Sequence, residues 1–264
     1  MAELIFLGTA GAVASKTRDN TSFLLRNENE LILIDTPGSL IHKLEKIKRD
    51  FRKIKTLLFT HSHPDHIYGI VSFIHSQYKL KNILQIYATN KTITIIKTLR
   101  KIFSLKNQKL YPRLIFHPLK NEYRAFYDSK GLKIFFFKTK HSDGSVGFRI
   151  VFKNKNIVIS GDTPFDPRVI KEATRVIKEA KGSYILIHDC FSPEKFFKKY
   201  PFLNKKHTSS LKLGILAQEI HPQILIPVHF SSELKYSFSE ILGEIRKNFK
   251  GRIIIPYDFL KISF

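Results

Sequence analysis

The sequence predicts a layered α/β protein with mixed sheets, and three observations lead to that class. Apolar runs of strand length recur from Leu4 to Ile262, and segments with helical spacing lie between them. The order begins with strands and then alternates between the two kinds of element. The chain has 264 residues, 43% of them apolar, and carries no repeat or linker. We therefore expect one domain with one large core over residues 1–264.

The first elements are expected to be strands joined by a glycine-rich turn. Leu4 to Leu7 is followed by Gly8 to Gly11 and by a second strand from Ser22 to Leu25. Glu3 stands where a secretory signal carries a basic residue, so we interpret the N-terminus as part of the fold. No apolar run approaches the ~20 residues of a membrane-spanning helix. We expect a cytoplasmic protein with no membrane partner.

Periodicity predicts the remaining elements. Further strands are expected at Leu31 to Ile34, Thr56 to Phe59, Ile83 to Tyr87, Leu114 to Phe116, Leu132 to Thr139, Gly147 to Phe152, Ile157 to Ser160, Tyr184 to Ile187, Ile224 to Val228 and Ile253 to Ile255. Helices are expected at Ile41 to Ile54, Ile67 to Tyr78, Asn90 to Ile102, Pro167 to Ala180, Ser209 to Ile220 and Phe238 to Phe249. In the first helix, Lys43 belongs to a basic stripe that we expect to face solvent.

Charge and cysteine content restrict the chemistry. The formal net charge of +23 attracts polyanions, which fits RNA or phosphorylated substrates. Enrichment in lysine and isoleucine from an AT-rich genome or a hot habitat explains the charge equally well. Cys190 is the only cysteine, which excludes an intrachain disulfide and a cysteine-rich zinc site. Any metal ion must therefore be held by histidines and carboxylates.

The densest chemical signal is the pattern H-x-H-x-D-H, formed by His61, His63, Asp65 and His66 directly after an apolar strand-like run. Imidazole nitrogens and carboxylate oxygens are the ligands that zinc accepts when thiolates are absent. A surface loop that binds nothing is the alternative, but four such side chains beside a hydrophobic strand require pairing or a metal. The pattern therefore predicts a metal site.

More candidate ligands follow other predicted strands. His141, Asp162, the pair His188 and Asp189, and His229 each come at the end of an apolar run. Taken singly, each is more often a structural histidine or a turn. Side chains at the carboxyl ends of neighbouring strands can gather at one edge of a sheet, where active sites are commonly built. Their shared position predicts one site.

Five ordered motifs and two additional ones carry a family resemblance. The motifs are Leu7-Gly8-Thr9-Ala10-Gly11 with Arg18, Asn20 and Ser22 and then Ile34-Asp35-Thr36-Pro37-Gly38, next His61 to His66, then His141, then Ser160-Gly161-Asp162-Thr163, and last His229-Phe230-Ser231. Two additional ones are Leu186 to Phe191 and His207-Thr208-Ser209. Together they resemble the metallo-β-lactamase superfamily and, within it, the ribonuclease Z group and related phosphodiesterases. The resemblance implies an αββα sandwich of two mixed sheets flanked by helices.

The resemblance also implies a dinuclear centre. One ion takes His61, His63 and His141, the other takes Asp65, His66 and His229, and Asp162 bridges them. The expected ions are two divalent cations, zinc by preference with manganese as the alternative. Such a pair generates a hydroxide nucleophile at neutral pH and stabilises the oxygens of a displacement at phosphorus.

In the ribonuclease Z group an acid and a histidine deliver the proton that a leaving alkoxide needs. The resemblance assigns these roles to Asp189 and His207, which with Asp65 make up the expected catalytic residues. Asp189 replaces the usual glutamate and is shorter by one methylene. Thr208 or Ser209 is independently expected to cap the following helix.

Two segments concern the substrate. About twenty residues separate His141 from Asp162, which leaves no room for the tRNA-binding arm that ribonuclease Z enzymes commonly insert there. Between Pro193 and Lys206, lysines alternate with aromatic residues, so the segment either contacts a nucleic acid or packs its rings inward.

The expected function is a metal-dependent phosphodiesterase that acts on RNA 3′ ends or on a small or cyclic phosphodiester. Hydrolysis of a thioester, lactone or β-lactam on the same fold is one alternative. A non-catalytic nucleic-acid-binding member of the fold is the other. The expected partner is a phosphodiester substrate, with RNA included, and a homodimer is compatible with the sequence.

Overall fold

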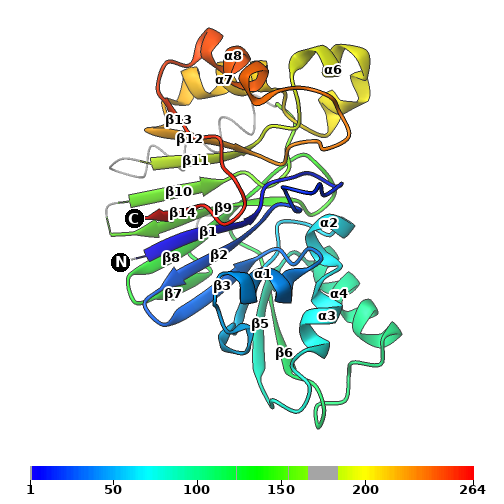
Figure 1. Ribbon diagram of the computed structural model, residues 1–264. Coiled ribbons are helices and arrows are strands. Elements are labelled where there is room, and N and C mark those ends of the chain that lie inside the picture. The colour runs from blue at the N-terminus through cyan, green and yellow to red at the C-terminus, as the bar shows by residue number, and fades with distance from the viewer. Residues whose placement is uncertain (1, 123, 154, 166–183) are drawn as a thin grey trace. The chain divides into compact units, whose positions relative to one another are not determined.

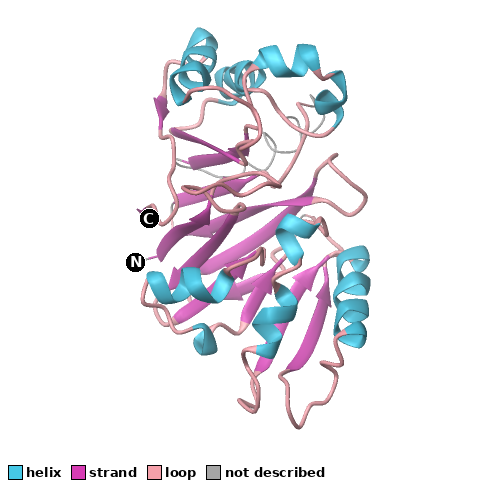
Figure 2. Ribbon diagram, turned by 45° about the vertical axis from the view of Figure 1, so that its right-hand side comes forward, coloured by secondary structure: helices cyan, strands magenta, loops and turns pink. Residues whose placement is uncertain are grey.

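The computed structural model describes residues 2–122, 124–153, 155–165 and 184–264. Contacts group the chain into two units, each built around one seven-stranded mixed sheet. The first unit comprises residues 1–9, 16–120 and 257–264, and the second comprises residues 10–15 and 121–256. The expected class of α/β protein with two mixed sheets and flanking helices is confirmed (Figure 2).

The sheet of the first unit has the order β14-β1-β2-β3-β4-β5-β6 (Figure 1). Its strands are β1 (Ala2–Gly8), β2 (Ser22–Asn27), β3 (Glu30–Ile34), β4 (Thr56–Leu58), β5 (Ile83–Ala88), β6 (Arg113–Pro118) and β14 (Lys261–Ser263). Strands β3 to β6 are mutually parallel, so their carboxyl ends lie at one edge of the sheet. The loop that follows β4 therefore begins at that edge.

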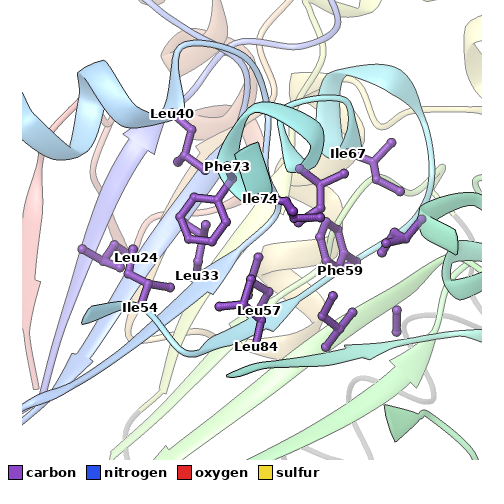
Figure 3. Close-up of a cluster of buried hydrophobic side chains, with 14 of the residues drawn as sticks. Leu24, Leu33, Leu40, Ile54, Leu57, Phe59, Ile67, Phe73, Ile74 and Leu84 are labelled. Atoms are coloured by element: carbon purple, nitrogen blue, oxygen red, sulfur yellow. The ribbon is translucent and has the colours of Figure 1, made fainter. Parts of the chain in front are cut away.

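Helices cover one face of this sheet. They are α1 (Leu40–Lys46), α2 (Pro64–Ile67), α3 (Ile70–His75) and α4 (Asn90–Ile102). Figure 3 shows part of the core between these helices and the strands, where Leu33, Leu57 and Leu84 meet Phe73 and Ile74. All five side chains are fully buried, and each such burial contributes about 1.5–3 kcal/mol to folding.

The sheet of the second unit has the order β13-β12-β11-β10-β9-β8-β7. Its strands are β7 (Tyr127–Ser129), β8 (Leu132–Lys138), β9 (Val146–Phe152), β10 (Lys155–Ile159), β11 (Tyr184–Asp189), β12 (Ile224–Val228) and β13 (Arg252–Ile253). Strands β10, β11 and β12 are parallel, and β8 runs in the same direction because two antiparallel pairings connect it to β10. The residues after these four strands therefore lie at one edge.

Two helices, α7 (Ser210–Ile220) and α8 (Phe238–Asn248), pack together against this second sheet, and α6 (Glu194–Lys199) precedes them. Gly214 in α7 permits the close approach, since an added Cβ would lie 2.6 Å from the backbone oxygen of Ile245 in α8. Ser237 begins α8 with a capping box to Glu240.

Most predicted elements are present, but the helix predicted from Ile41 to Ile54 is wrong. Helix α1 ends at Lys46, because Lys48 takes a left-handed backbone with φ 55°, and residues Phe51–Lys53 form a short 3-10 helix instead. The solvent-facing role predicted for Lys43 is also wrong: its side chain is 3% exposed and its Nζ lies 3.2 Å from Asp19 Oδ2.

The helix predicted from Ile67 to Tyr78 is shorter in the structure and is divided into α2 and α3 at Gly69. An added Cβ on Gly69 would lie 2.0 Å from the carbonyl oxygen of Pro37, so only glycine fits here. The helix predicted from Pro167 to Ala180 lies outside the described residues.

Within the part of the chain that the structure describes, no helix has the length and apolar character needed to cross a membrane.

Candidate metal centre

The four ligands predicted from the H-x-H-x-D-H pattern lie together in the first unit. The ring centroid of His61 is 4.6 Å from that of His63 and 4.2 Å from that of His66. Oδ2 of Asp65 is 3.3 Å from Nε2 of His66. His63 has an extended backbone and Pro64 begins α2, a position that suits proline because the first helical residue needs no hydrogen-bonded N–H. This turn from strand to helix brings the side chains of the four candidate ligands close together.

Asp35 orients two of these histidines through a buried network. Its Oδ2 accepts hydrogen bonds from Nδ1 of His66 at 2.8 Å and from Oγ1 of Thr60 at 2.7 Å. Because the Thr60 hydroxyl proton is used in that bond, Thr60 Oγ1 accepts from Nδ1 of His61, 3.0 Å away. Both imidazoles therefore carry their proton on Nδ1 and present the lone pair of Nε2, the arrangement typical of metal-bound histidine.

The backbone around Asp35 is held in an unusual conformation. Asp35 has a left-handed φ of 61°. The next residue is fixed by two backbone hydrogen bonds: Thr36 N–H donates to the carbonyl of His66, and Gly69 N–H donates to the carbonyl of Thr36. Burial raises the pKa of Asp35, while the hydrogen bonds from His66 and Thr60 oppose that rise. In the sequence, Asp35 is recognisable only as part of the motif Ile34 to Gly38, which does not reveal that it orients two candidate ligands.

In the second unit, the three predicted ligands His141, Asp162 and His229 follow β8, β10 and β12. Nε2 of His229 is 3.1 Å from Oδ2 of Asp162, and Nε2 of His141 is 3.6 Å from the same oxygen. Nδ1 of His141 donates to the carbonyl of Lys206 at 2.6 Å, which again directs Nε2 toward the carboxylate. The Asp162 carboxylate thus lies beside both histidines.

Asp189 and His207 are also close in the second unit. Nδ1–H of His207 donates to Oδ2 of Asp189 at 2.9 Å, and the backbone N–H of Thr163 donates to the same oxygen at 3.0 Å. The shorter carboxylate of aspartate therefore reaches the histidine. Complete burial raises the pKa of Asp189 to about 7, although the facing His207 acts in the opposite direction.

The ring of His207 is held by aromatic stacking. Phe191 stacks on it at 4.5 Å with an interplanar angle of 14°, and His229 does so at 5.1 Å with an angle of 21°. Helix α7 is capped by Ser209, whose Oγ accepts from the N–H of Lys212, so capping does not use His207. Candidate ligand atoms of His141, Asp162 and His207 lie within 4.8 Å of one another, which places His207 beside the predicted ligands.

In each unit taken by itself, the candidate ligands fit a divalent metal ion. The donors are imidazole nitrogens and carboxylate oxygens, the set that zinc and manganese accept. Neighbouring candidate donor atoms are 3.1 to 3.6 Å apart. An ion with bonds of about 2.0–2.1 Å in tetrahedral geometry requires ligand separations of roughly 3.3 Å. In His61, His66 and His141, Nδ1 is held by a hydrogen bond, which leaves Nε2 available to a metal ion and supports the assignment of a metal site.

The basic segment before His207 shows both patterns that the sequence left open. Phe197 packs inward with 1% exposure, whereas Phe202 is 65% exposed. Lys198 and Lys199, at the end of α6, are exposed. The segment therefore presents lysines and one aromatic ring to solvent.

His188, one residue before Asp189, provides a pH-dependent prediction. Burial lowers the pKa of His188 to about 4, so the folded state holds it neutral. The unfolded chain, with a pKa near 6.5, binds more protons between pH 6.5 and pH 4, and stability must fall as the pH decreases through that window. The contribution is at most about 3 kcal/mol and is fully present at pH 7.

The measurement is urea unfolding of the wild type and of His188→Gln at pH 7, 5.5 and 4.5. The glutamine amide can still donate to the Asp189 carbonyl, as Nδ1 of His188 does at 2.8 Å. We expect the wild type to lose stability more steeply than the variant as the pH falls. Parallel pH dependences of the two proteins would show that His188 does not make this contribution.

Comparisons with known proteins agree with this fold and these motifs. A family model described as "Anti-Pycsar protein Apyc1" matches residues 2–243. The ribonuclease Z of Saccharolobus solfataricus is 30% identical over 305 residues, which covers 100% of this chain and 99% of that protein. The ribonuclease Z of Archaeoglobus fulgidus is 22% identical over 304 residues, covering 99% and 97%.

Solved structures show the same fold. The metallo-β-lactamase fold protein YhfI from Bacillus subtilis matches with a TM-score of 0.79 and 17% identity, covering 99% of this chain and 98% of that one. The short form of human tRNase Z matches with a TM-score of 0.76 and 21% identity, with the same coverage.

The fold and the motifs therefore define a metallo-β-lactamase-fold protein of the ribonuclease Z-like kind, as the sequence predicted. Within that class, the chain belongs to the family described as Anti-Pycsar protein Apyc1. These relatives support a hydrolase of the phosphodiesterase and nuclease kind, and the fold together with the histidine and aspartate clusters suggests divalent metal ions.

Proposed function

We propose that this protein is a phosphodiesterase that uses two divalent ions and that residues 1–264 make up a single domain. Zinc is the proposed metal, with manganese as the alternative. The proposed ligands are His61, His63 and His141 for one ion, Asp65, His66 and His229 for the other, and Asp162 for both. When bound, such ions supply a nucleophile at neutral pH and neutralise charge at phosphorus.

The observation that carries the phosphodiester assignment is the hydrogen bond between His207 and Asp189. Since Nδ1–H of His207 is held by the carboxylate, Nε2 is the atom that can carry a proton to a leaving oxygen. The negative charge of Asp189 stabilises the imidazolium, and stacking by Phe191 restricts the ring to one plane. A ribose alkoxide needs such a proton, whereas the thiolate that leaves from a thioester does not. The leaving groups of a lactone and a β-lactam also need a proton, so the substrate panel below separates those alternatives.

The proposed substrates bind without an arm inserted between His141 and Asp162. Between His141 and Asp162 the described residues form β9, β10 and their connecting turns. We propose that substrates are RNA 3′ ends or small or cyclic phosphodiesters that bind without an arm. The proposal places the protein in the cytoplasm, and size-exclusion chromatography would show whether it works as a homodimer.

A substrate panel tests the proposed function. Bis(p-nitrophenyl) phosphate, precursor tRNA and cyclic nucleotides should be compared with a thioester, a lactone and a β-lactam, each with and without zinc or manganese. We expect metal-dependent turnover of at least one phosphodiester. Turnover confined to the thioester, the lactone or the β-lactam would show that the protein hydrolyses carboxylic derivatives and not phosphodiesters. Nucleic-acid binding without turnover of any substrate would favour a non-catalytic nucleic-acid-binding protein.

A further inference from the structure

An aromatic pair lies on the sheet of the first unit, near the end of β4, the strand that leads to the candidate ligands His61 to His66, here called the metal loop. Tyr87 in β5 and His117 in β6 are register partners on adjacent parallel strands. Their rings are parallel within 14°, with centroids 4.4 Å apart. Nε2 of His117 lies 2.6 Å from Oε1 of Gln85, which fixes the orientation of the imidazole. The pair is therefore a rigid, oriented stack.

The stack projects from the face of β5 and β6 opposite to the helices. Side chains alternate along β5, and Leu84 and Ile86 are fully buried in the helix-covered core, so Tyr87 projects from the other face. On that same face, Leu58 of β4 and Ile34 of β3 are fully buried. Tyr87 and His117 are instead partly exposed. The face thus becomes accessible at the aromatic pair.

His117 belongs to the edge strand of its sheet. The sheet ends at β6, so the side of the imidazole away from Tyr87 is directed toward the sheet edge. Among the described residues, Tyr87 is the ring that stacks on His117. A further planar group can therefore extend the stack on the outer side of His117.

The pair is also close to the metal loop within the same unit. Tyr87 is the register partner of Leu58, and the backbone N–H of Phe59 donates to the carbonyl of Tyr87 at 3.0 Å. His61 follows Leu58, the last residue of β4, by three residues, so their Cα atoms are at most roughly 10 Å apart. The carboxyl ends of β4, β5 and β6 share one edge, so a ligand held at the metal loop can reach the stack.

We propose that Tyr87 and His117 form a stacking platform for a nucleobase of the substrate. This inference rests on the proposed phosphodiesterase function and makes the substrate a nucleotide or oligonucleotide, as opposed to a base-free diester. Every base has a π-face, so a stacking platform tolerates different bases. Phosphates of the same substrate are attracted by the net charge of +23.

The test compares two substrates that differ in one feature. One is a nucleoside phosphodiester, and the other is the same ribose diester without its base, with an identical leaving group. For the wild type we expect the base to lower KM about 10-fold, the lower part of the range for base stacking on aromatic side chains. His117→Leu should abolish this difference in KM while kcat stays within about 2-fold, because the platform holds the substrate but takes no part in bond cleavage.

Rescue separates stacking from a structural role. His117→Phe keeps a planar ring and should restore the preference for the base-containing substrate, whereas Tyr87→Leu should weaken it. His42→Leu, which changes an exposed histidine on α1, is the matched control and should keep the preference. Thermal unfolding and metal content should be measured for each variant, so that loss of folding is recognised.

Two failures are distinguishable. If the wild type hydrolyses both substrates with the same KM, the platform is wrong and the proposed phosphodiesterase function stands. If neither substrate is hydrolysed, the phosphodiesterase function fails, and titration with a fluorescent 2-aminopurine nucleotide decides the platform. Quenching of 2-aminopurine by the wild type but not by His117→Leu supports stacking on the pair, and equal quenching or none overturns it.

Discussion

Replacing His207 by alanine is expected to slow hydrolysis of an unactivated phosphodiester by roughly 10²–10⁴-fold, the range for a positioned acid or base. A ribose oxygen must be protonated as its bond to phosphorus breaks, whereas p-nitrophenolate departs readily as an anion. The same variant should therefore retain much of its activity on bis(p-nitrophenyl) phosphate. The measurement is kcat/KM on both substrates, together with metal content by elemental analysis.

The structure supplies the reason for a second variant. Oδ2 of Asp189 accepts from Nδ1–H of His207 at 2.9 Å, so the carboxylate orients the ring and stabilises the imidazolium, whose Nε2–H is the proton available to a leaving oxygen. Asp189→Asn should show the same selective pattern more mildly, since it keeps the shape of the side chain and removes its charge. His42→Ala, on the exposed surface of α1, is the control for histidine replacement and should leave both rates unchanged.

Two results would contradict the proton-donor role. His207 lies beside His141 and Asp162, with candidate ligand atoms within 4.8 Å, so loss of metal in His207→Ala would make it a ligand. Equal slowing of the activated and unactivated substrates would show that no proton transfer to the leaving group depends on His207.

The clustering of the candidate ligands from His61 to His66 could be predicted because its information is local. His61 to His66 occupy six consecutive positions after a buried strand. Their residue types and spacing indicate a metal site without knowledge of the rest of the chain. The positions of His141, Asp162 and His229 could be predicted at strand ends because apolar runs mark where strands stop. Their distances of 3.1 and 3.6 Å to one carboxylate oxygen depend on the pairing of β8 to β12, which the sequence does not reveal.

Other features depend on contacts between distant residues. Asp35 sets the tautomers of His61 and His66, but its hydrogen-bond partners Thr60 and His66 lie 25 and 31 positions further along the chain. No short sequence pattern therefore reveals this role. Lys43 follows the helical spacing of a surface lysine, yet the pairing with Asp19 buries it. The stack of Tyr87 on His117 likewise depends on the register of β5 with β6.

Replacing Asp162 by alanine is expected to abolish the dinuclear centre. Its Oδ2 lies 3.1 Å from Nε2 of His229 and 3.6 Å from Nε2 of His141, two histidines that the proposal assigns to different ions. Removing the carboxylate takes a negatively charged ligand from both ions at once. We expect close to two ions per chain in the zinc-saturated wild type and about one or fewer in Asp162→Ala.

Activity should fall at least roughly 10²–10³-fold in this variant, because charge stabilisation by a metal ion contributes several kcal/mol to the transition state. Asp162→Asn preserves the volume and removes the charge, so a similar loss in both variants assigns the effect to the charge and not to a cavity. Asp128→Ala, on an aspartate of β7 whose side chain is 58% exposed, is the surface control.

Zinc binding offers a readout that does not require activity. A ligand that binds the folded state raises its unfolding temperature, so zinc should raise the Tm of the wild type and of Asp128→Ala more than that of Asp162→Ala. One ion per saturated wild-type chain would reject the dinuclear assignment outright. If Asp162→Ala retained two ions, the dinuclear centre would stand but Asp162 would not be its bridge. His141 and His229 would then hold their ions together with ligands other than this carboxylate.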